Sequence, residues 1–126
     1  MTYSVAIVED DESIARAMAD IMHVVIGDYV EIRTYTRVVD LPDDPKPDAV
    51  LLDLNLDDTR GLKTVERFNG YPAPVVIFTA VDDPPLLETL RRCGHRVIQK
   101  PHAVDAAEAI QEVLAGEVFA AAVLSR

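Results

Sequence analysis

The sequence predicts an α/β fold in which five parallel strands form a doubly wound sheet, with about five helices on its two faces. Two observations lead to this prediction. Short apolar runs without polar alternation, such as Val5–Val8 and Ala49–Leu52, are typical of parallel strands buried on both faces. These runs alternate with segments of helical periodicity, and parallel strands need such crossover connections.

Composition places the chain among ordinary globular domains. Its 126 residues are enough for one domain with a core, and 49% of them are hydrophobic. A formal net charge of −10 argues against direct binding of nucleic acid or an anionic membrane, and suits cations or basic partners. The start of the chain lacks a signal-peptide pattern and no apolar run is long enough to span a membrane, so we expect a cytoplasmic protein. The single cysteine, Cys93, fits a reducing compartment, and we expect it in the core.

The first strand is followed by a predicted helix and then by an edge strand. Apolar residues recur at helical spacing from Ile14 to Val25, with Asp11 or Ser13 as the N-cap and Gly27 just past the end. Residues Val30–Tyr35 instead alternate between apolar and polar, which predicts a strand with one wetter face.

The segment before the third strand is poor in helix signals. Pro42, Pro45 and Pro47 forbid a long helix, so we expect at most one or two turns around Arg37–Leu41. The third strand is then predicted at Ala49–Leu52.

The second half of the chain continues the alternation. A helix is predicted at about Leu62–Phe68 and stopped by Gly70, and the fourth strand follows at Val75–Phe78. The next helix begins at Asp82–Pro85, because proline is tolerated in a first turn, and Gly94 ends it.

The last strand is predicted at Val97–Ile98, and the last helix begins near Ala103. We expect Gly116 to interrupt that helix. Residues 1–116 are therefore predicted to form the domain, and residues 117–126 a C-terminal tail or the start of a linker.

Right-handed crossovers between these strands favour the flavodoxin-like order 2-1-3-4-5, which puts the alternating second strand at an edge. Four of the predicted strands are followed directly or closely by residues whose side chains can bind ions or react. Glu9 and Asp10 follow the first strand, Asp53 the third, Thr79 the fourth and Lys100 the fifth. Ligands of such sheets bind outside the carboxyl ends of the strands. This set of carboxylates, a hydroxyl and an ammonium suits a divalent cation and a phosphoryl group.

From about Tyr3 to Leu114, the chain resembles the receiver domain of two-component response regulators. The resemblance rests on five marks in order: Glu9-Asp10, Asp53, Gly61 eight residues later, Thr79-Ala80 and Lys100-Pro101. It implies a phosphoprotein that is a signalling switch rather than an enzyme, and whose partner is a histidine kinase.

The resemblance also implies a role for each residue. Asp53 would accept the phosphoryl group as an aspartyl phosphate. Asp10, Asp53 and the backbone carbonyl of Asn55 would ligate Mg²⁺ directly, and Glu9 would act through water.

Lys100 would pair with Asp53 at rest and with the phosphoryl oxygens afterwards. The Thr79 hydroxyl would donate to a phosphoryl oxygen, although a β-branched strand residue whose hydroxyl caps the next turn is an alternative. The bond before Pro101 corresponds to a peptide that is often cis in the family.

Two positions depart from the family pattern. Val97 stands three residues before Lys100, where the family usually has an aromatic ring that rotates as a partner of the threonine. Asp57 replaces a frequent proline, and with Asp58 it adds negative charge near the pocket, unless these residues only form a polar loop tip.

Residues 109–119 look like the last receiver helix and linker of LuxR-type (NarL/FixJ) regulators. This implies transcription regulation, with DNA bound only through an output domain that this sequence lacks. It also implies a homodimer through the face of the fourth helix, fifth strand and fifth helix. No membrane partner is expected.

Two alternatives to the phosphorylated switch stay open. Val97 favours a phosphorylation-independent receiver that serves as a dimerisation or docking module. An aspartyl-phosphate phosphohydrolase of the haloacid dehalogenase type would need a second aspartate where this chain has Asn55.

Overall fold

The computed structural model describes residues 2–42 and 45–124, with side chains described as far as residue 116. Strands and helices alternate along the chain, as predicted. In order they are β1 (Tyr3–Val8), α1 (Glu12–Val25), β2 (Val30–Tyr35), the 3₁₀ helix η1 (Val38–Asp40), β3 (Ala49–Leu52), α2 (Leu62–Arg67), β4 (Val75–Thr79), α3 (Pro84–Arg92), β5 (Arg96–Gln99) and α4 (Ala103–Leu124).

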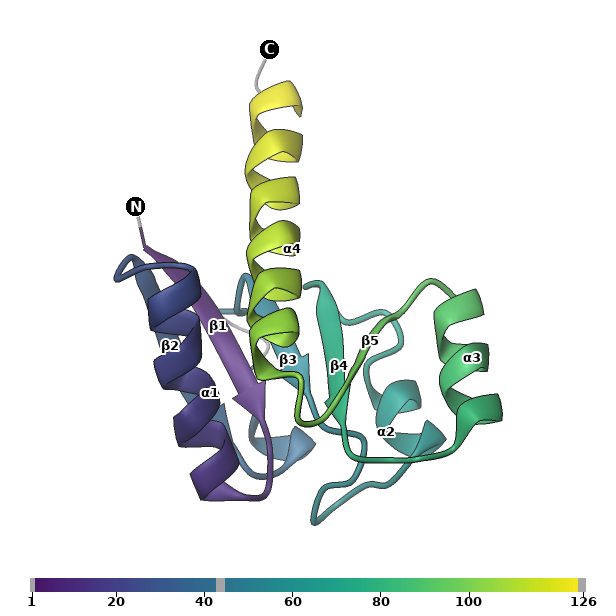
Figure 1. The fold of residues 1–126 in the computed structure, drawn as a ribbon. Helices are drawn as coiled ribbons and strands as arrows, with labels where there is room; N and C mark the ends of the chain where they lie inside the picture. Colours follow the sequence, from purple (N-terminus) through teal and green to yellow (C-terminus); the bar gives the residue numbers. More distant parts are fainter. Residues whose placement is uncertain (1, 43–44, 125–126) are drawn as a thin grey trace.

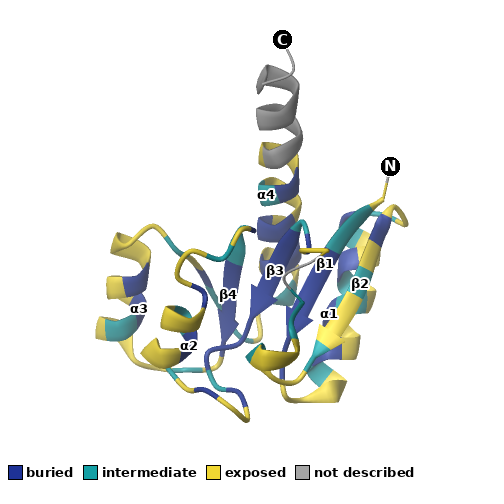
Figure 2. Cartoon of the chain, turned by 180° about the vertical axis from the view of Figure 1, so that it is seen from behind, coloured by how far each residue is buried: buried dark blue, intermediate teal, exposed yellow. Residues whose placement is uncertain are grey.

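The five strands form one parallel sheet with the order β2-β1-β3-β4-β5, which confirms the predicted topology. Helices α1 and α4 cover one face of the sheet, and α2 and α3 lie on the other (Figure 1). Strand β2 is at the edge, as its alternating pattern predicts, and its exposed residues contrast with the buried central strands in Figure 2.

Strand β1 is apolar from Val5 to Val8 because both of its faces are buried there. Val5 and Ile7 belong to the core beneath α1 and α4. Ala6 and Val8 belong to a second core on the opposite face, which also includes Phe68. A strand with two covered faces has no position for a polar residue until it ends. The charged residues therefore begin at the carboxyl end of β1.

The connection between β2 and β3 contains only η1, so the described part of the chain has four α-helices and not about five. The short turn confirms the prediction around Arg37–Leu41. Its physical cause is the density of prolines, at Pro42, Pro45 and Pro47, because each lacks an N–H for a helix hydrogen bond.

Helix α4 continues through Gly116 to Leu124, so the predicted interruption there is wrong. A glycine inside a helix costs only about 1 kcal/mol relative to alanine, and the surrounding alanines are strong helix formers. The domain boundary predicted at residue 116 is therefore not marked by a helix end. No helix in the described part of the chain combines the length and apolarity needed to cross a bilayer.

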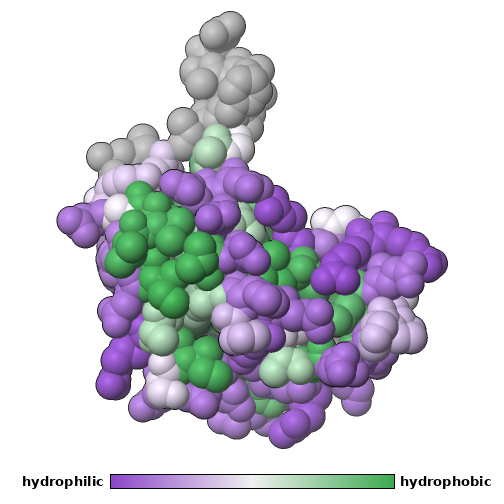
Figure 3. Space-filling model, in the orientation of Figure 1, coloured by the Kyte–Doolittle hydropathy of each residue, from purple (hydrophilic) through white to green (hydrophobic). Residues whose placement is uncertain are grey.

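The expected core position of Cys93 is also wrong. Cys93 is the C-cap of α3 and is exposed. The buried residues of that helix are Leu87 and Leu90, which pack with Ile77 and Val97 in the core beneath α3. On the opposite side of the molecule, hydrophobic side chains gather over the C-terminal half of α1, where Val24 is 85% exposed (Figure 3).

Candidate functional site

Three carboxylates meet at the carboxyl ends of two adjacent strands. Glu9 and Asp10 follow β1, and Asp53 follows β3, which pairs directly with β1. The backbone N–H of Asp53 donates to the Val8 carbonyl at 3.0 Å, which continues the sheet to this residue. One carboxylate oxygen from each of the three acids lies within 4.8 Å of the others. Glu9 and Asp53 are buried, whereas Asp10 is exposed.

Lys100 reaches this cluster from the end of β5. Its Nζ lies 2.9 Å from Glu9 Oε2 and 3.4 Å from Asp53 Oδ2. The expected approach of Lys100 to Asp53 is thus present, but the shorter contact is with Glu9. The ammonium also lies 5.8 Å from the centre of the Phe78 ring. The peptide bond between Lys100 and Pro101 is cis.

Burial and charge act on the two partners of this ion pair in opposite directions. Burial raises the pKa of Glu9 from 4.5 to about 7, against the lowering effect of the hydrogen bond from Lys100, and the Asp53 charge adds to the rise. Burial alone would lower the pKa of Lys100. The hydrogen bond to Glu9 and the charges of Asp53 and Glu9 outweigh it and raise this pKa. One ammonium therefore faces two buried carboxyl groups.

Thr79 ends β4 and is fully buried beside Lys100, whose backbone N–H donates to the Thr79 carbonyl at 2.8 Å. The Thr79 Oγ1 accepts a hydrogen bond from the Val81 N–H at 3.1 Å. The hydroxyl thus caps the following turn in this state, which is the alternative noted for it from the sequence.

Asn55 lies in the loop that follows Asp53. Its backbone N–H donates to Asp53 Oδ1 at 3.3 Å, and it forms an isolated antiparallel bridge with Arg60. Two threonines in and after this loop, Thr59 and Thr64, are buried, which was not predicted. Their burial had no local sequence signal, because neither belongs to a periodic apolar pattern.

Asp58, in the same loop, does more than add charge to a loop tip. Its carboxylate accepts hydrogen bonds from the backbone N–H groups of Val38 at 3.2 Å and Val39 at 3.3 Å. It therefore caps the first turn of η1 from a distant part of the chain. No sequence pattern indicates this contact, because it joins two loops twenty residues apart.

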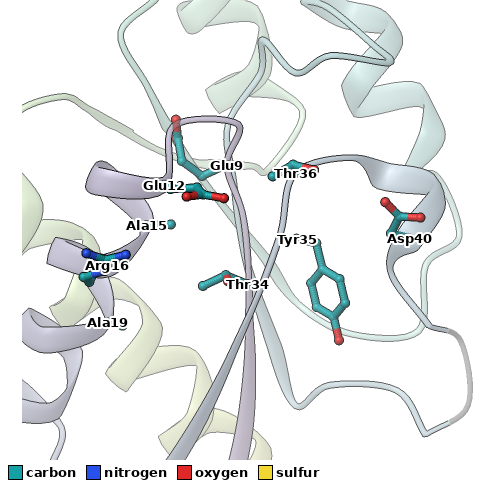
Figure 4. A pocket seen from close by; sticks show the side chains of 9 residues that line it. All are labelled: Glu9, Glu12, Ala15, Arg16, Ala19, Thr34, Tyr35, Thr36 and Asp40. Atoms are coloured by element: carbon teal, nitrogen blue, oxygen red, sulfur yellow. The ribbon is translucent and has the colours of Figure 1, made fainter.

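A groove of about 560 Å³ opens beside the acidic cluster, between α1 and the edge strand β2 (Figure 4). Small residues of α1, Ala15 and Ala19, leave this space open against Thr34 of β2. Glu9 lines the groove, so the carboxylate cluster is next to an open surface.

The donor set fits a hard divalent cation. Mg²⁺ prefers oxygen ligands and is usually held by one or two carboxylates together with water. Asp10 and Asp53 offer such oxygens within 4.8 Å of each other and of Glu9, and Asp10 is open to solvent. The single Lys100 charge leaves the cluster negative.

Comparison with known protein families agrees with this geometry. The sequence profile of the response regulator receiver domain matches residues 5–113. The chain belongs to this family. The receiver has no match among curated proteins.

Solved structures share the fold of this receiver over nearly its whole length. A signal receiver domain from Vibrio parahaemolyticus has a TM-score of 0.82 at 22% identity, covering 98% of each chain. A LuxR-family DNA-binding response regulator from Staphylococcus aureus has a TM-score of 0.72 at 22% identity, with 89% of this chain and 98% of that chain covered. A response regulator receiver protein from Burkholderia phymatum has a TM-score of 0.69 at 29% identity, with 90% and 96% covered.

Val97 of the receiver occupies the position expected for a rotating aromatic ring. It is buried against Ile77 of β4 and the α3 residues Leu87 and Leu90. A valine held in such a cluster has no ring or polar tip to exchange between two positions.

Proposed function

We propose that this receiver takes a phosphoryl group from a histidine kinase onto Asp53 and thereby switches an output surface. The observation that carries the proposal is the convergence of Asp53, Glu9, Asp10 and Lys100 at one sheet edge. In the transfer, an Asp53 carboxylate oxygen attacks the phosphorus, the phosphorus–nitrogen bond to the kinase histidine breaks, and an acyl phosphate forms.

The side chains around Asp53 have distinct roles in this proposal. Asp10, Asp53 and the carbonyl of Asn55 would hold Mg²⁺ directly, and Glu9 would do so through water. When bound, the ion would neutralise negative charge on the phosphoryl oxygens. Lys100 would leave Glu9 and Asp53 to neutralise the new phosphate. The Thr79 hydroxyl keeps its own proton when Oγ1 accepts from Val81, so it can donate to a phosphoryl oxygen.

We also propose that the output surface is formed by α3, β5 and α4 and that it joins two copies of the receiver. These elements correspond to the fourth helix, fifth strand and fifth helix of the sequence-based prediction, because only η1 lies between β2 and β3 in the described part of the chain. Two contacts already connect these elements. Arg91 of α3 donates to the Val97 carbonyl at 3.4 Å, and Arg96 of β5 pairs with Glu112 of α4 at 2.7 Å.

Transcription regulation is the biological role that we propose for this switch. The pattern of residues 109–119 supports it, with residues 117–126 as the start of a linker to a DNA-binding output domain. The receiver itself carries a net charge of −10 and is not suited to touch DNA.

Phosphorylation at Asp53 can be tested with acetyl phosphate and Mg²⁺. We expect the intact mass to rise by one phosphoryl group that hydroxylamine removes. Asp53→Asn should abolish this gain, while Asp57→Asn, which changes a nearby exposed carboxylate, should retain it. Binding of beryllofluoride in the presence of Mg²⁺, followed by ¹⁹F NMR, gives a second readout that needs no phosphodonor. Full labelling of Asp53→Asn, or no beryllofluoride binding to the wild type, would contradict the proposal.

The buried Val97 favours a second candidate function, a receiver that docks or dimerises without phosphorylation. In that case the protein would form the same complexes whether or not Asp53 can be modified. An Asp53→Asn variant with unchanged activity in the cell would identify this function.

A further inference from the structure

The hydroxyl groups of two buried threonines form hydrogen bonds that hold the loop after Asp53. Thr64 is fully buried in α2, and its Oγ1 donates to the carbonyl oxygen of Leu54 at 2.6 Å. Thr59 is also buried, and its Oγ1 forms a hydrogen bond with that of Thr64. A hydroxyl has one proton to donate. Because Thr64 uses its proton on Leu54, Thr59 is the donor to Thr64.

These contacts determine which way the backbone of Asn55 faces. The Leu54 carbonyl accepts a second hydrogen bond from the Gly61 N–H at 2.9 Å, and the Leu56 N–H donates to the Thr59 carbonyl at 2.8 Å. Asn55 and Arg60 form an isolated antiparallel bridge, and when the flanking residues make its hydrogen bonds, the N–H and C=O of each bridged residue point away from the partner. The groups of Leu54 and Leu56 point toward the partner segment, so those of Asn55 point away from it.

The observed contact of Asn55 agrees with this direction. Its N–H donates to Asp53 Oδ1 at 3.3 Å. The N–H and carbonyl of a residue in an antiparallel bridge face the same side. The Asn55 carbonyl therefore faces the side of the loop on which Asp53 lies, close to Glu9 and Asp10.

We propose that Thr64, assisted by Thr59, is a positioning residue for the divalent cation. Its hydroxyl holds the Leu54 carbonyl inside the loop and thereby keeps the next carbonyl, that of Asn55, directed at the carboxylates. This inference rests on the proposed function, because it needs a cation at the Asp53 site. A hydroxyl pair is otherwise a poor choice at a fully buried position, where two apolar side chains would avoid desolvation.

The test is a calorimetric titration with Mg²⁺ in the absence of any phosphodonor. Thr64→Val keeps the shape of the side chain and removes the donor. We expect its dissociation constant to rise about tenfold, the lower end of the range for groups that orient metal ligands. Thr64→Ser keeps a hydroxyl and should restore most of the affinity. Thr89→Val is the control, because it deletes a hydroxyl bond of 2.8 Å on the exposed face of α3.

A double variant separates positioning from simple stability. Thr64→Val leaves the buried Thr59 hydroxyl without its acceptor, whereas Thr59→Val combined with Thr64→Val leaves neither hydroxyl, and removal of both partners can be nearly neutral for stability. In metal-free urea unfolding, the double variant should therefore be more stable than Thr64→Val. Its Mg²⁺ affinity should stay weak, because Leu54 still lacks its side-chain donor. Recovery of affinity together with stability would overturn the proposal, as would wild-type affinity in Thr64→Val.

The same titration distinguishes this inference from the proposed function. Asp10→Ala should lose Mg²⁺ binding. If the wild type binds no Mg²⁺, or Asp10→Ala binds it equally well, the metal site and the role of Thr64 both fail. If Asp10→Ala loses binding while Thr64→Val keeps it, only the role of Thr64 is wrong.

Discussion

At the scale of single residues, Lys100 faces two buried carboxyl groups with one positive charge. Its ammonium is 2.9 Å from Glu9 and 3.4 Å from Asp53, so neither carboxylate has a full partner of its own. Burial then disfavours the second negative charge. The pKa of Glu9 rises to about 7 for this reason, with its burial as the largest cause. A divalent cation at this edge would remove the imbalance.

The raised pKa predicts how stability depends on pH in metal-free buffer. Unfolded Glu9 releases its proton near pH 4.5, and the folded protein holds it until about pH 7. Between these values the folded state binds more protons, so the contribution of Glu9 to the free energy of unfolding falls as pH rises. We expect Glu9→Gln to remove this decline, because its amide does not titrate.

The measurement is urea unfolding of both proteins from pH 4.5 to 8 in the presence of a chelator. The difference in stability between the wild type and Glu9→Gln should change across this window and level off above pH 7. Lys100 does not titrate in this range, since its raised pKa keeps it charged. Parallel pH profiles for the two proteins would contradict the prediction.

At the scale of elements, the accuracy of the sequence-based prediction depended on how local the signal was. Strand β3 could be read from four apolar residues, and α3 from Asp83 before two prolines. The continuation of α4 through Gly116 could not be read, because a glycine is compatible with either a break or a continuous helix. The cap that Asp58 provides for η1 joins distant loops and leaves no pattern in the sequence.

The continuous helix α4 predicts the sign of a substitution at Gly116. An added Cβ at this position meets no atom within 4 Å. Alanine loses less backbone entropy on folding than glycine, so Gly116→Ala should stabilise the protein by about 0.5–1 kcal/mol. Gly94→Ala is the control, because Gly94 has a φ of +92° that disfavours a side chain. Urea unfolding measures both. A destabilised Gly116→Ala variant would favour the break that the sequence suggested.

The candidate site could also be predicted only in part from the sequence. Glu9, Asp10, Asp53 and Lys100 could be expected together, because parallel strands deliver their carboxyl ends to one edge. The preference of Lys100 for Glu9 depends on side-chain packing, which the order of residues does not specify.

At the scale of the whole molecule, the proposed phosphorylation of Asp53 would have to change a surface some distance from this residue. The surface proposed for this output contains β5, which is bonded to α3 through Arg91 and to α4 through Glu112. In the family pattern, a ring near β5 turns together with the threonine. Here Val97 is fixed in the core beneath α3, and Thr79 is bonded to the next turn. The aromatic ring that would turn together with the threonine is therefore absent at this position.

This arrangement predicts a weak response to activation. A ligand shifts an equilibrium only by the difference of its affinities for the two states. A phosphoryl analogue can draw Thr79 and Lys100 toward Asp53, but Val97 has no second position to stabilise. Only the backbone of the loop after β4 remains to carry the change.

We therefore expect beryllofluoride with Mg²⁺ to alter dimerisation only slightly. Sedimentation over a concentration series, with Asp53→Asn as the variant that cannot be activated, measures this. A large cooperative shift to dimer in the wild type alone would show that this receiver switches without an aromatic ring, through a movement of the loop that follows Thr79.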